Sequence, residues 1–173
     1  MERAVAVRPA LPEDGQVLFA MNRAFNGEGV ASPQEAALAL AHPGPERVLL
    51  AFVAGEPAGF LCGLLKRSAC YSRPSAEVTE LYVCPGCRRQ GVARQLLEAF
   101  LDACRQEGVE AVTVLTGEDN APAQALYQKW AFPPAGRSTS SRGCEYGSKK
   151  SPGFSGGFPV YQAFALQSAR RFS

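Results

Sequence analysis

The sequence predicts one α/β domain in which helices cover a mixed, mostly antiparallel sheet. Its 173 residues have the size of one ordinary domain, and 46% of them are hydrophobic while 20% are charged, a globular composition. Short runs of β-branched and aromatic residues are interspersed with segments whose apolar residues recur at helical spacing. One pair of strand-like runs is joined by a tight turn and another pair flanks a long helix, so both antiparallel and parallel pairing are expected.

The N-terminal part predicts a strand followed by two helices. Residues 4–8 (AVAVR) form a short β-like run that Pro9 closes, and the apolar residues between 17 and 25 then recur at helical spacing. A second helix is predicted to begin at Ser32-Pro33, because serine is a favoured N-cap and proline is tolerated at the first helical position.

The central part predicts a hairpin and then a further strand. Residues 47–54 and 58–66 are apolar runs of strand length separated by Gly-Glu-Pro, which indicates two antiparallel strands joined by a turn at 55–57. Residues 76–83 (AEVTELYV) are rich in β-branched and aromatic side chains and are followed by a Pro-Gly breaker, so they predict the fourth strand.

From Gly91 the apolar residues fall on one stripe of a helix of about four turns, and Gly108 stands where a left-handed C-terminal cap is expected. Residues 110–116 predict a fifth strand, and residues 120–130 predict a final helix. The order is therefore β-α-α-β-β-β-α-β-α, which we assign to a folded domain over residues 1–132.

The remainder, residues 133–173, is expected to be an irregular C-terminal segment. Its first part, up to residue 158, is dominated by proline, glycine, serine and basic residues without a sustained apolar period. Residues 160–166 could return as a strand at the edge of the sheet.

Composition and charge argue against several classes of partner. The formal net charge of +2 is too small to indicate nucleic-acid binding. No stretch reaches the roughly 18 consecutive apolar residues of a membrane span, and the N-terminus lacks the apolar core of a signal peptide. We therefore expect a cytoplasmic protein without nucleic-acid or membrane partners, whose six cysteines are reduced thiols.

The segment between the fourth strand and the long helix has the composition of a diphosphate site. A helix N-terminus exposes unpaired N–H groups and carries roughly half a positive charge, so it attracts phosphate. Gly91 and Ala93 leave this backbone accessible, and Arg88 and Arg89 add positive charge beside it. From this local pattern alone, two solvated arginines beside a turn glycine are an equally good account.

Two motifs in this region resemble those of the GNAT superfamily of N-acetyltransferases. The pattern R-x-x-G-x-A over residues 88–93, directly after the strand ending in ELYV, resembles the coenzyme A signature of the superfamily. The pattern N-x5-L-Y-x-K-x-x-F over residues 120–132 resembles its second motif. The resemblance covers residues 5–132 by element order and residues 78–132 by motif.

The resemblance implies acetyl-CoA as cofactor and a fold of GNAT type, and it looks closest to the aminoglycoside 3-N-acetyltransferase branch. The strand backbone should pair with the pantetheine arm, and loop N–H groups should hold the pyrophosphate. The cofactor-binding residues so implied are Leu81, Tyr82, Val83, Arg88, Arg89, Gln90, Gly91, Val92, Ala93 and Asn120. The sequence departs from the superfamily at Trp130, which stands near a common glycine, and in the tail, which lacks two regular closing strands.

Acyl transfer to an amine requires a group that takes the ammonium proton and one that protonates the leaving thiolate. The resemblance places Tyr127 beside the thioester sulfur, on one helical face with Asn120, so Tyr127 is the candidate general acid; a core tyrosine is the alternative. Glu80, taken to alternate with Val78 and Tyr82 on one strand face, is the candidate base or acceptor-orienting residue, with an ion pair to an arginine as its structural alternative.

Glu28 lies between two glycines in the loop joining the first two helices, and the resemblance implies that this loop borders the acceptor. An exposed loop acid is the ordinary alternative for such a residue. Glu28 is therefore a second candidate substrate-binding residue beside Glu80.

The sequence C-x-x-C at Cys84 and Cys87 gives a rival interpretation, because a dithiol between a strand and a helix suits redox chemistry. The pair leads directly into the coenzyme A signature, which favours the acyltransferase. No metal site is predicted, because there is no second cysteine pair at ligand spacing and His42, the one histidine, is remote in sequence.

The sequence thus predicts direct transfer of an acetyl group from acetyl-CoA to a primary amine of a small molecule, such as an aminoglycoside or a polyamine. A protein or peptide amine is the alternative acceptor, since acceptor identity varies widely on one fold. A non-catalytic acetyl-CoA-binding module and a dithiol oxidoreductase are the other classes. The oligomeric state is left open, a homodimer included.

Overall fold

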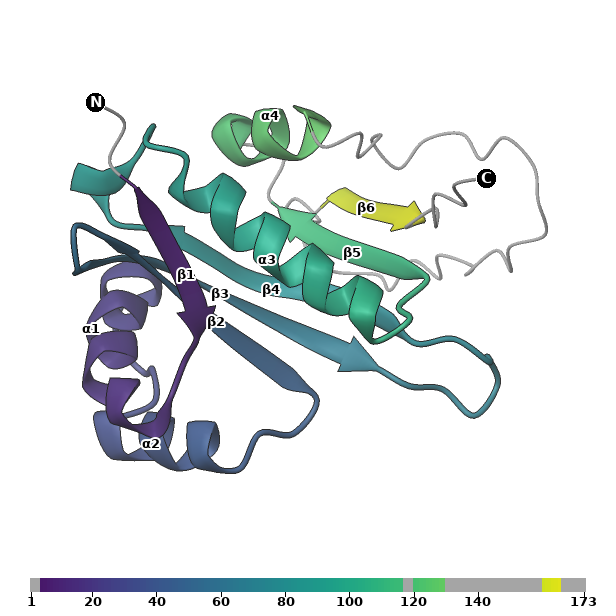
Figure 1. The fold of residues 1–173 in the computed structure, drawn as a ribbon, viewed down its shortest axis with the longest axis horizontal. Coiled ribbons are helices and arrows are strands. Elements are labelled where there is room, and N and C mark those ends of the chain that lie inside the picture. Colours follow the sequence, from purple (N-terminus) through teal and green to yellow (C-terminus); the bar gives the residue numbers. More distant parts are fainter. Residues whose placement is uncertain (1–3, 117–119, 130–159, 166–173) are drawn as a thin grey trace, which may run out of the picture.

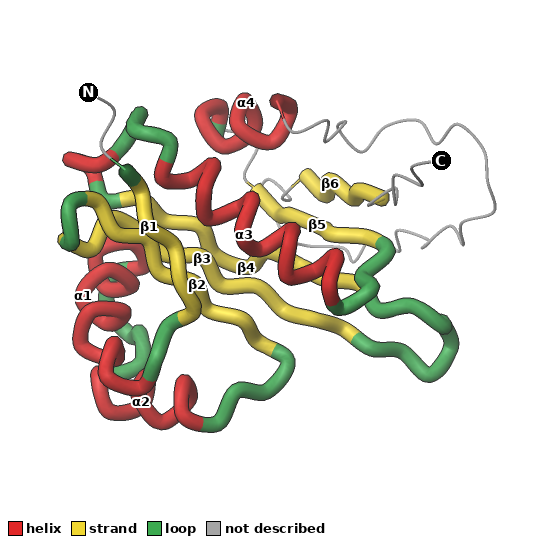
Figure 2. Tube along the Cα trace, viewed as in Figure 1, coloured by secondary structure: helices red, strands yellow, loops and turns green. Residues whose placement is uncertain are grey.

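The structure is a computed structural model of the chain, and it describes residues 4–116, 120–129 and 160–165. Within these residues, six strands form one sheet in which sequence order and spatial order coincide. The first two helices cover one face of this sheet and the third lies across the other (Figures 1 and 2). The predicted fold class and element order are confirmed.

The N-terminal elements are β1 (Val5–Pro9), a 3₁₀ turn (Pro12–Asp14), α1 (Gly15–Asn26) and α2 (Pro33–Ala41). The predicted start of α2 is confirmed, because the Ser32 hydroxyl accepts a hydrogen bond from the Glu35 N–H while the Glu35 carboxylate accepts one from the Ser32 N–H. This reciprocal capping box satisfies two N–H groups that the helix itself cannot pair.

The hairpin consists of β2 (Glu46–Val53) and β3 (Glu56–Lys66). Its turn is Ala54-Gly55 rather than the predicted 55–57, and Glu56 pairs with Val53 as the first residue of β3. Both turn residues have positive φ, 53° and 85°, as the tightest hairpins require. The proline of the sequence Gly-Glu-Pro therefore lies inside a strand, and it does not mark the turn.

The remaining elements are β4 (Ser75–Val83), a 3₁₀ turn (Pro85–Cys87), α3 (Val92–Gln106), β5 (Ala111–Thr116), α4 (Ala121–Lys129) and β6 (Val160–Ala165). β4 is antiparallel to β3 and parallel to β5, and β6 pairs antiparallel with β5 at the sheet edge. β6 falls within the predicted range 160–166, whereas residues 133–158 and Trp130 lie outside the described part of the chain.

Two apolar clusters lie on opposite faces of the sheet. The larger one packs the predicted stripe of α3 against the strands and includes Tyr127 of α4. The smaller one packs Met21 of α1 against Phe60 of β3 and Tyr82 of β4. α4 therefore shares the α3 face, and the face under α1 and α2 is left with a thinner apolar layer.

The prediction that Glu80 shares one strand face with both Val78 and Tyr82 is wrong, because β4 contains a bulge. Cys62 of β3 pairs with Glu80, but the next residue, Gly63, pairs with Val78, so Thr79 is the extra residue. An inserted residue reverses the alternation of side chains along a strand. Val78 consequently packs in the cluster under α3, whereas Glu80 and Tyr82 face α1 and α2.

Candidate active site

A cavity of about 210 Å³ lies between the sheet and the two N-terminal helices. Its apolar walls come from both helices, with Leu18 and Phe19 on α1 and Leu40 on α2. Its floor contains Glu46, Cys62 and Glu80, which belong to three neighbouring strands. A larger hollow of about 480 Å³ lies between β1 and α3, and none of the predicted site residues lines it.

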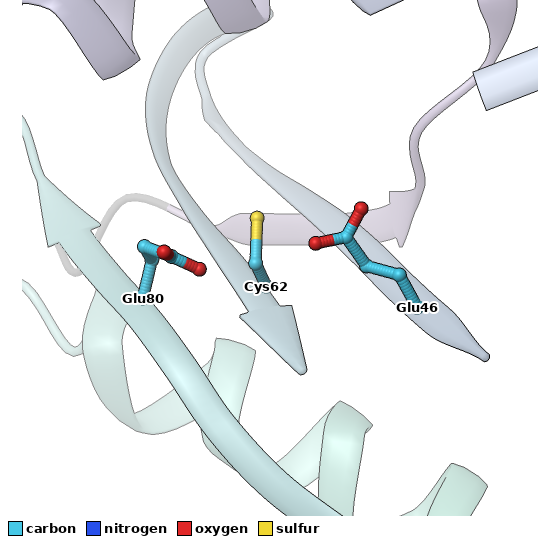
Figure 3. Close-up of side chains that lie close together, drawn as sticks. All are labelled: Glu46, Cys62 and Glu80. Atoms are coloured by element: carbon cyan, nitrogen blue, oxygen red, sulfur yellow. The ribbon is translucent and has the colours of Figure 1, made fainter. Parts of the chain in front are cut away.

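The three floor residues converge on one point (Figure 3). The Cys62 sulfur stands between the two carboxyl groups, and one ligand atom from each residue lies within 4.8 Å of the others. Loss of solvent and the neighbouring Glu80 raise the pKa of Glu46. Burial, followed by the two nearby carboxylates, raises the pKa of Cys62, so its thiol stays protonated at neutral pH.

Sequence reasoning identified Glu80 but missed Glu46 and Cys62. Glu46 stands just before the predicted strand, and Cys62 sits in a continuous apolar run, where a cysteine is an ordinary core residue. Strand pairing brings the three residues together. In β2 the partner of Cys62 is Val48, which stands two residues after Glu46, and in β4 its partner is Glu80. That register cannot be obtained from local periodicity.

The surroundings of Glu80 argue against the alternative role of this residue, a structural ion pair with an arginine. Among the described residues no arginine or lysine forms an ion pair with Glu80 or Glu46. The hydroxyl of Thr79, the bulge residue, lies against the Glu80 carboxylate and 3.2 Å from the Cys62 carbonyl oxygen. Glu80 thus presents its carboxyl group to the cavity without a basic partner in the described part of the chain.

The loop from Arg88 to Gly91 has the geometry of an anion cradle. Arg89 and Gly91 both have left-handed backbone, with φ of 63° and 82°. The N–H groups of Val92 and Ala93 belong to the first turn of α3, where the helix itself offers no acceptor. Successive unpaired N–H groups at the N-terminus of a 15-residue helix form a nest that suits a phosphate.

Two side chains hold this loop in place. The Arg88 Nε lies 3.3 Å from the carbonyl oxygen of Val83 and donates to it, and the Gln90 amide donates to the carbonyl oxygen of Gly86 at 3.0 Å. Arg88 therefore connects the end of β4 to the loop. Val92 is different, because its side chain is buried in the core under α3 and only its backbone remains for a ligand.

The edge of β4 beside the cradle is available where the prediction requires it. The parallel ladder with β5 ends at Val78 opposite Val114, so Leu81, Tyr82 and Val83 have no β5 partner in the described part of the chain. A strand whose neighbour has diverged can present backbone groups to a ligand, although here Arg88 already donates to the carbonyl oxygen of Val83. Along the chain, Glu80 of the cavity, the edge at residues 81–83 and the cradle at residues 88–91 follow one another in β4 and the loop after it.

The two predicted residues around α4 have different environments. The Asn120 side-chain oxygen accepts a hydrogen bond from the Ala123 N–H at 3.3 Å, so this exposed residue caps α4. Tyr127 is 4% exposed and lies in the cluster under α3, where burial raises the pKa of its phenol to about 12. Tyr127 and Glu80 thus lie on opposite faces of the sheet.

The structure does not bring Glu28 to the cavity. Its carboxyl group is 89% exposed and pairs with Arg23 at 3.0 Å on the surface of α1. Cys84 and Cys87 are free thiols, Cys84 directly before the 3₁₀ turn that precedes the cradle and Cys87 at its end. Burial, and then the neighbouring Cys87, raises the pKa of Cys84, the opposite of the change that activates a redox thiol.

The sequence matches the Acetyltransferase (GNAT) family over residues 17–132. The chain therefore belongs to the GNAT acetyltransferase family. A mycothiol acetyltransferase from Brachybacterium faecium is 33% identical over 72 residues, which are 42% of this chain but only 22% of that protein. The chain thus spans about a fifth of that relative.

Two solved structures show the same fold. A GNAT-family acetyltransferase from Streptococcus pneumoniae superposes with a TM-score of 0.70 at 17% identity, covering 94% of this chain and 99% of that one. An aminoglycoside acetyltransferase from an uncultured soil metagenomic sample, in complex with sisomicin, gives a TM-score of 0.62 at 18% identity, covering 84% and 97%. No helix in the described part of the chain is long and apolar enough to cross a membrane.

Proposed function

We propose that this protein transfers an acetyl group from acetyl-CoA to a primary amine of a small molecule that carries several amino groups, such as an aminoglycoside or a polyamine. One observation carries the proposal. Glu80, which has no basic partner among the described residues, faces an acidic cavity, and the end of the same strand has parted from β5 and leads into the loop before α3.

The residues present fit coenzyme A. The N–H groups at the start of α3 suit the pyrophosphate, and the exposed Arg88 and Arg89 add charge at the same point. The backbone of Leu81 to Val83 suits an extended amide-containing arm, because no β5 residue in the described part of the chain pairs with it, although Arg88 donates to the Val83 carbonyl oxygen. When bound, acetyl-CoA supplies the acetyl group as a thioester.

The floor of the cavity would hold and deprotonate the acceptor. Two carboxylates, Glu46 and Glu80, attract an ammonium group, and the apolar walls make their surroundings less polar than water and so strengthen this attraction. An amine attacks only in its neutral form, so Glu80 accepts its proton directly or through a water molecule. Glu46 then retains a charge that can hold a second amino group of the same molecule.

Tyr127 would be the general acid that protonates the leaving thiolate. Its pKa of about 12 keeps the phenol protonated throughout the physiological range, so it always has a proton to donate. Tyr127 lies under α3, across the sheet from Glu80, so the two could act on one thioester only where β4 and β5 have separated, beyond Val78. Both the proton donor and the direct transfer in a ternary complex are parts of this proposal.

The mycothiol acetyltransferase named above supports the small-molecule class of acceptor. The likeness to the aminoglycoside acetyltransferase in complex with sisomicin concerns the fold alone. A cavity of about 210 Å³ admits an amino group and its immediate neighbours, with the rest of a larger acceptor outside. The acidic floor favours acceptors of multiple positive charge over single amino acids.

The test is acetyl-CoA turnover, followed as free thiol, across aminoglycosides, polyamines, amino acids and peptides with free N-termini. We expect the highest kcat/KM with an aminoglycoside or a polyamine. Preference for a peptide N-terminus would assign the chain to protein or peptide acetylation. Coenzyme A binding without turnover of any amine would instead indicate a binding module.

A further inference from the structure

We propose that Glu46, Cys62 and Glu80 form a binding site for one divalent cation of the zinc class in the floor of the cavity. Two carboxylates and one thiol from adjacent strands converge there (Figure 3). The local sequence gives no sign of this site, because its members are separated along the chain and only strand register unites them. The site does not depend on the acetyltransferase activity proposed above.

The geometry suits a tetrahedral metal ion after small movements. Zinc bonds of about 2.0–2.3 Å place neighbouring ligand atoms roughly 3.3–3.8 Å apart. The three ligand atoms already lie within 4.8 Å of one another, so modest side-chain rotations of the two glutamates would close the remaining distance. Cys62 needs no such freedom, since its sulfur already stands between the two carboxyl groups.

Burial and charge both favour a cation at this point. Cys62 is 8% exposed and belongs to the smaller apolar cluster, and its sulfur stands between the Glu46 and Glu80 carboxyl groups. When both glutamates are ionised, two negative charges face each other, and no basic side chain in the described residues pairs with either of them. A divalent cation would cancel this repulsion.

The ligand set selects the kind of metal. A sulfur ligand favours zinc and similar borderline ions over magnesium and calcium, which prefer oxygen alone. Three protein ligands leave a fourth position open to the cavity for water or another small ligand. On binding, the Cys62 sulfur exchanges its proton for the metal and the proton leaves to solvent, so no oxidant or reductant is required.

The site has a consequence that rests on the proposed function. A metal bound to Glu46 and Glu80 occupies the carboxylates that would hold the acceptor ammonium group. Metal and amine should therefore exclude each other. Zinc would be a reversible inhibitor that competes with the amine and leaves acetyl-CoA affinity unchanged.

The decisive probe is Co²⁺, whose bond to a thiolate gives a charge-transfer absorption in the near ultraviolet. The chain has other thiols, so the titration uses a background in which Cys70, Cys84, Cys87 and Cys144 are replaced by serine. Only Cys62 and the fully buried Cys104 then remain. We expect the thiolate absorption to saturate at one equivalent of Co²⁺.

Three further variants in this background locate the metal. Cys62→Ser should abolish the absorption, whereas Cys104→Ala, the matched control for loss of a buried thiol, should leave it intact. Glu46→Gln changes an exposed residue and should preserve the fold while weakening Co²⁺ binding by roughly 10–100-fold or more. Circular dichroism confirms folding of each variant.

Several outcomes would overturn the site. Absence of the thiolate absorption from the folded background protein is one, and its persistence in Cys62→Ser is another. Unchanged Co²⁺ affinity in Glu46→Gln would remove the carboxylate ligand and with it the proposal. If the chain shows no turnover of any amine, the proposed function fails but the Co²⁺ titration still decides the metal site.

Discussion

Cys62 and Glu80 lie directly opposite each other across β3 and β4, and the ladder slips by one residue immediately beyond them. The slip directs Glu80 into the cavity under α1 and α2, whereas regular alternation from Val78 would bury it under α3. It also occurs where β4 parts from β5. A single extra residue, Thr79, therefore sets the position of the acidic side chain relative to the free strand edge.

Replacement of Glu80 tests its role as base. Glu80→Gln should lower kcat/KM for the amine by about 10²–10⁴-fold, because the amide cannot accept the ammonium proton. The KM for acetyl-CoA should be nearly unchanged. Glu77→Gln, on the same strand but paired with Lys66, is the matched control and should retain activity. Equal losses in the two variants would mean that the effect is structural.

Arg88 tests the cradle. Arg88→Ala should weaken coenzyme A binding by about 1.5–3 kcal/mol, the range for a lost charge-assisted contact, as measured by titration calorimetry. Arg105→Ala, at the opposite end of α3, is the control and should bind normally. Unchanged affinity in Arg88→Ala would exclude this side chain from the cofactor site.

Gly91 tests the backbone conformation of the same loop. A side chain at this position would meet nothing within 4 Å, so the cost of substitution arises from φ of 82° and not from crowding. Gly91→Ala should therefore reduce the free energy of unfolding by about 1–2 kcal/mol. It should also weaken coenzyme A binding, because the loop relaxes away from the left-handed geometry. A stable variant with normal affinity would show that this conformation is dispensable.

Local structure could be predicted from the sequence because its causes are local. The apolar stripe of α3 and the Ser32 capping box are each contained within a few helical turns. The convergence of Glu46 and Cys62 with Glu80 has a different origin, since it depends on the register of three strands. Likewise, a proline suggested the hairpin turn, but it lies within β3, where Phe52 is its partner.

The cysteine pair beside the cradle should be dispensable for acyl transfer. The double variant Cys84→Ser and Cys87→Ser should keep kcat within a few-fold of the wild type, because the proposed chemistry uses no protein thiol. The raised pKa of Cys84 also disfavours a reactive thiolate. A collapse of activity with intact folding, checked alongside a disulfide-exchange assay, would instead support a redox role.

Asp14 links β1 to the first helix and should stabilise the fold in a pH-dependent manner. Arg8 donates to both Asp14 oxygens at 2.6 and 2.8 Å, and the Leu11 N–H donates to one of them at 2.7 Å. The Arg8 hydrogen bonds, partly offset by burial, hold the pKa of Asp14 below its usual value. Asp14→Asn should cost about 1.5–3 kcal/mol of unfolding free energy at neutral pH.

The sign of the pH effect follows from that lowered pKa. The ionised form is favoured by folding, so its contribution is fully present above the ordinary aspartate pKa of about 3.9 and is lost as the pH falls through the lower folded value. Denaturant unfolding of the wild type and Asp14→Asn should therefore differ by a constant amount between about pH 6 and 8. Below about pH 4 the difference should shrink. A difference independent of pH would assign the effect to packing.

Tyr127→Phe separates proton donation from packing. Tyr127 is 4% exposed within the cluster under α3, and phenylalanine fills the same space, so the packing should be kept and acetyl-CoA binding should change little. Loss of a general acid should lower kcat by about 10²–10⁴-fold. Because the pKa of the phenol is about 12, the wild type should show no loss of activity from its ionisation below about pH 11. A fall of only a few-fold would remove Tyr127 as the acid, because a thiolate with a pKa near ambient pH can leave without protonation. A higher KM for acetyl-CoA with unchanged kcat would make it a binding contact.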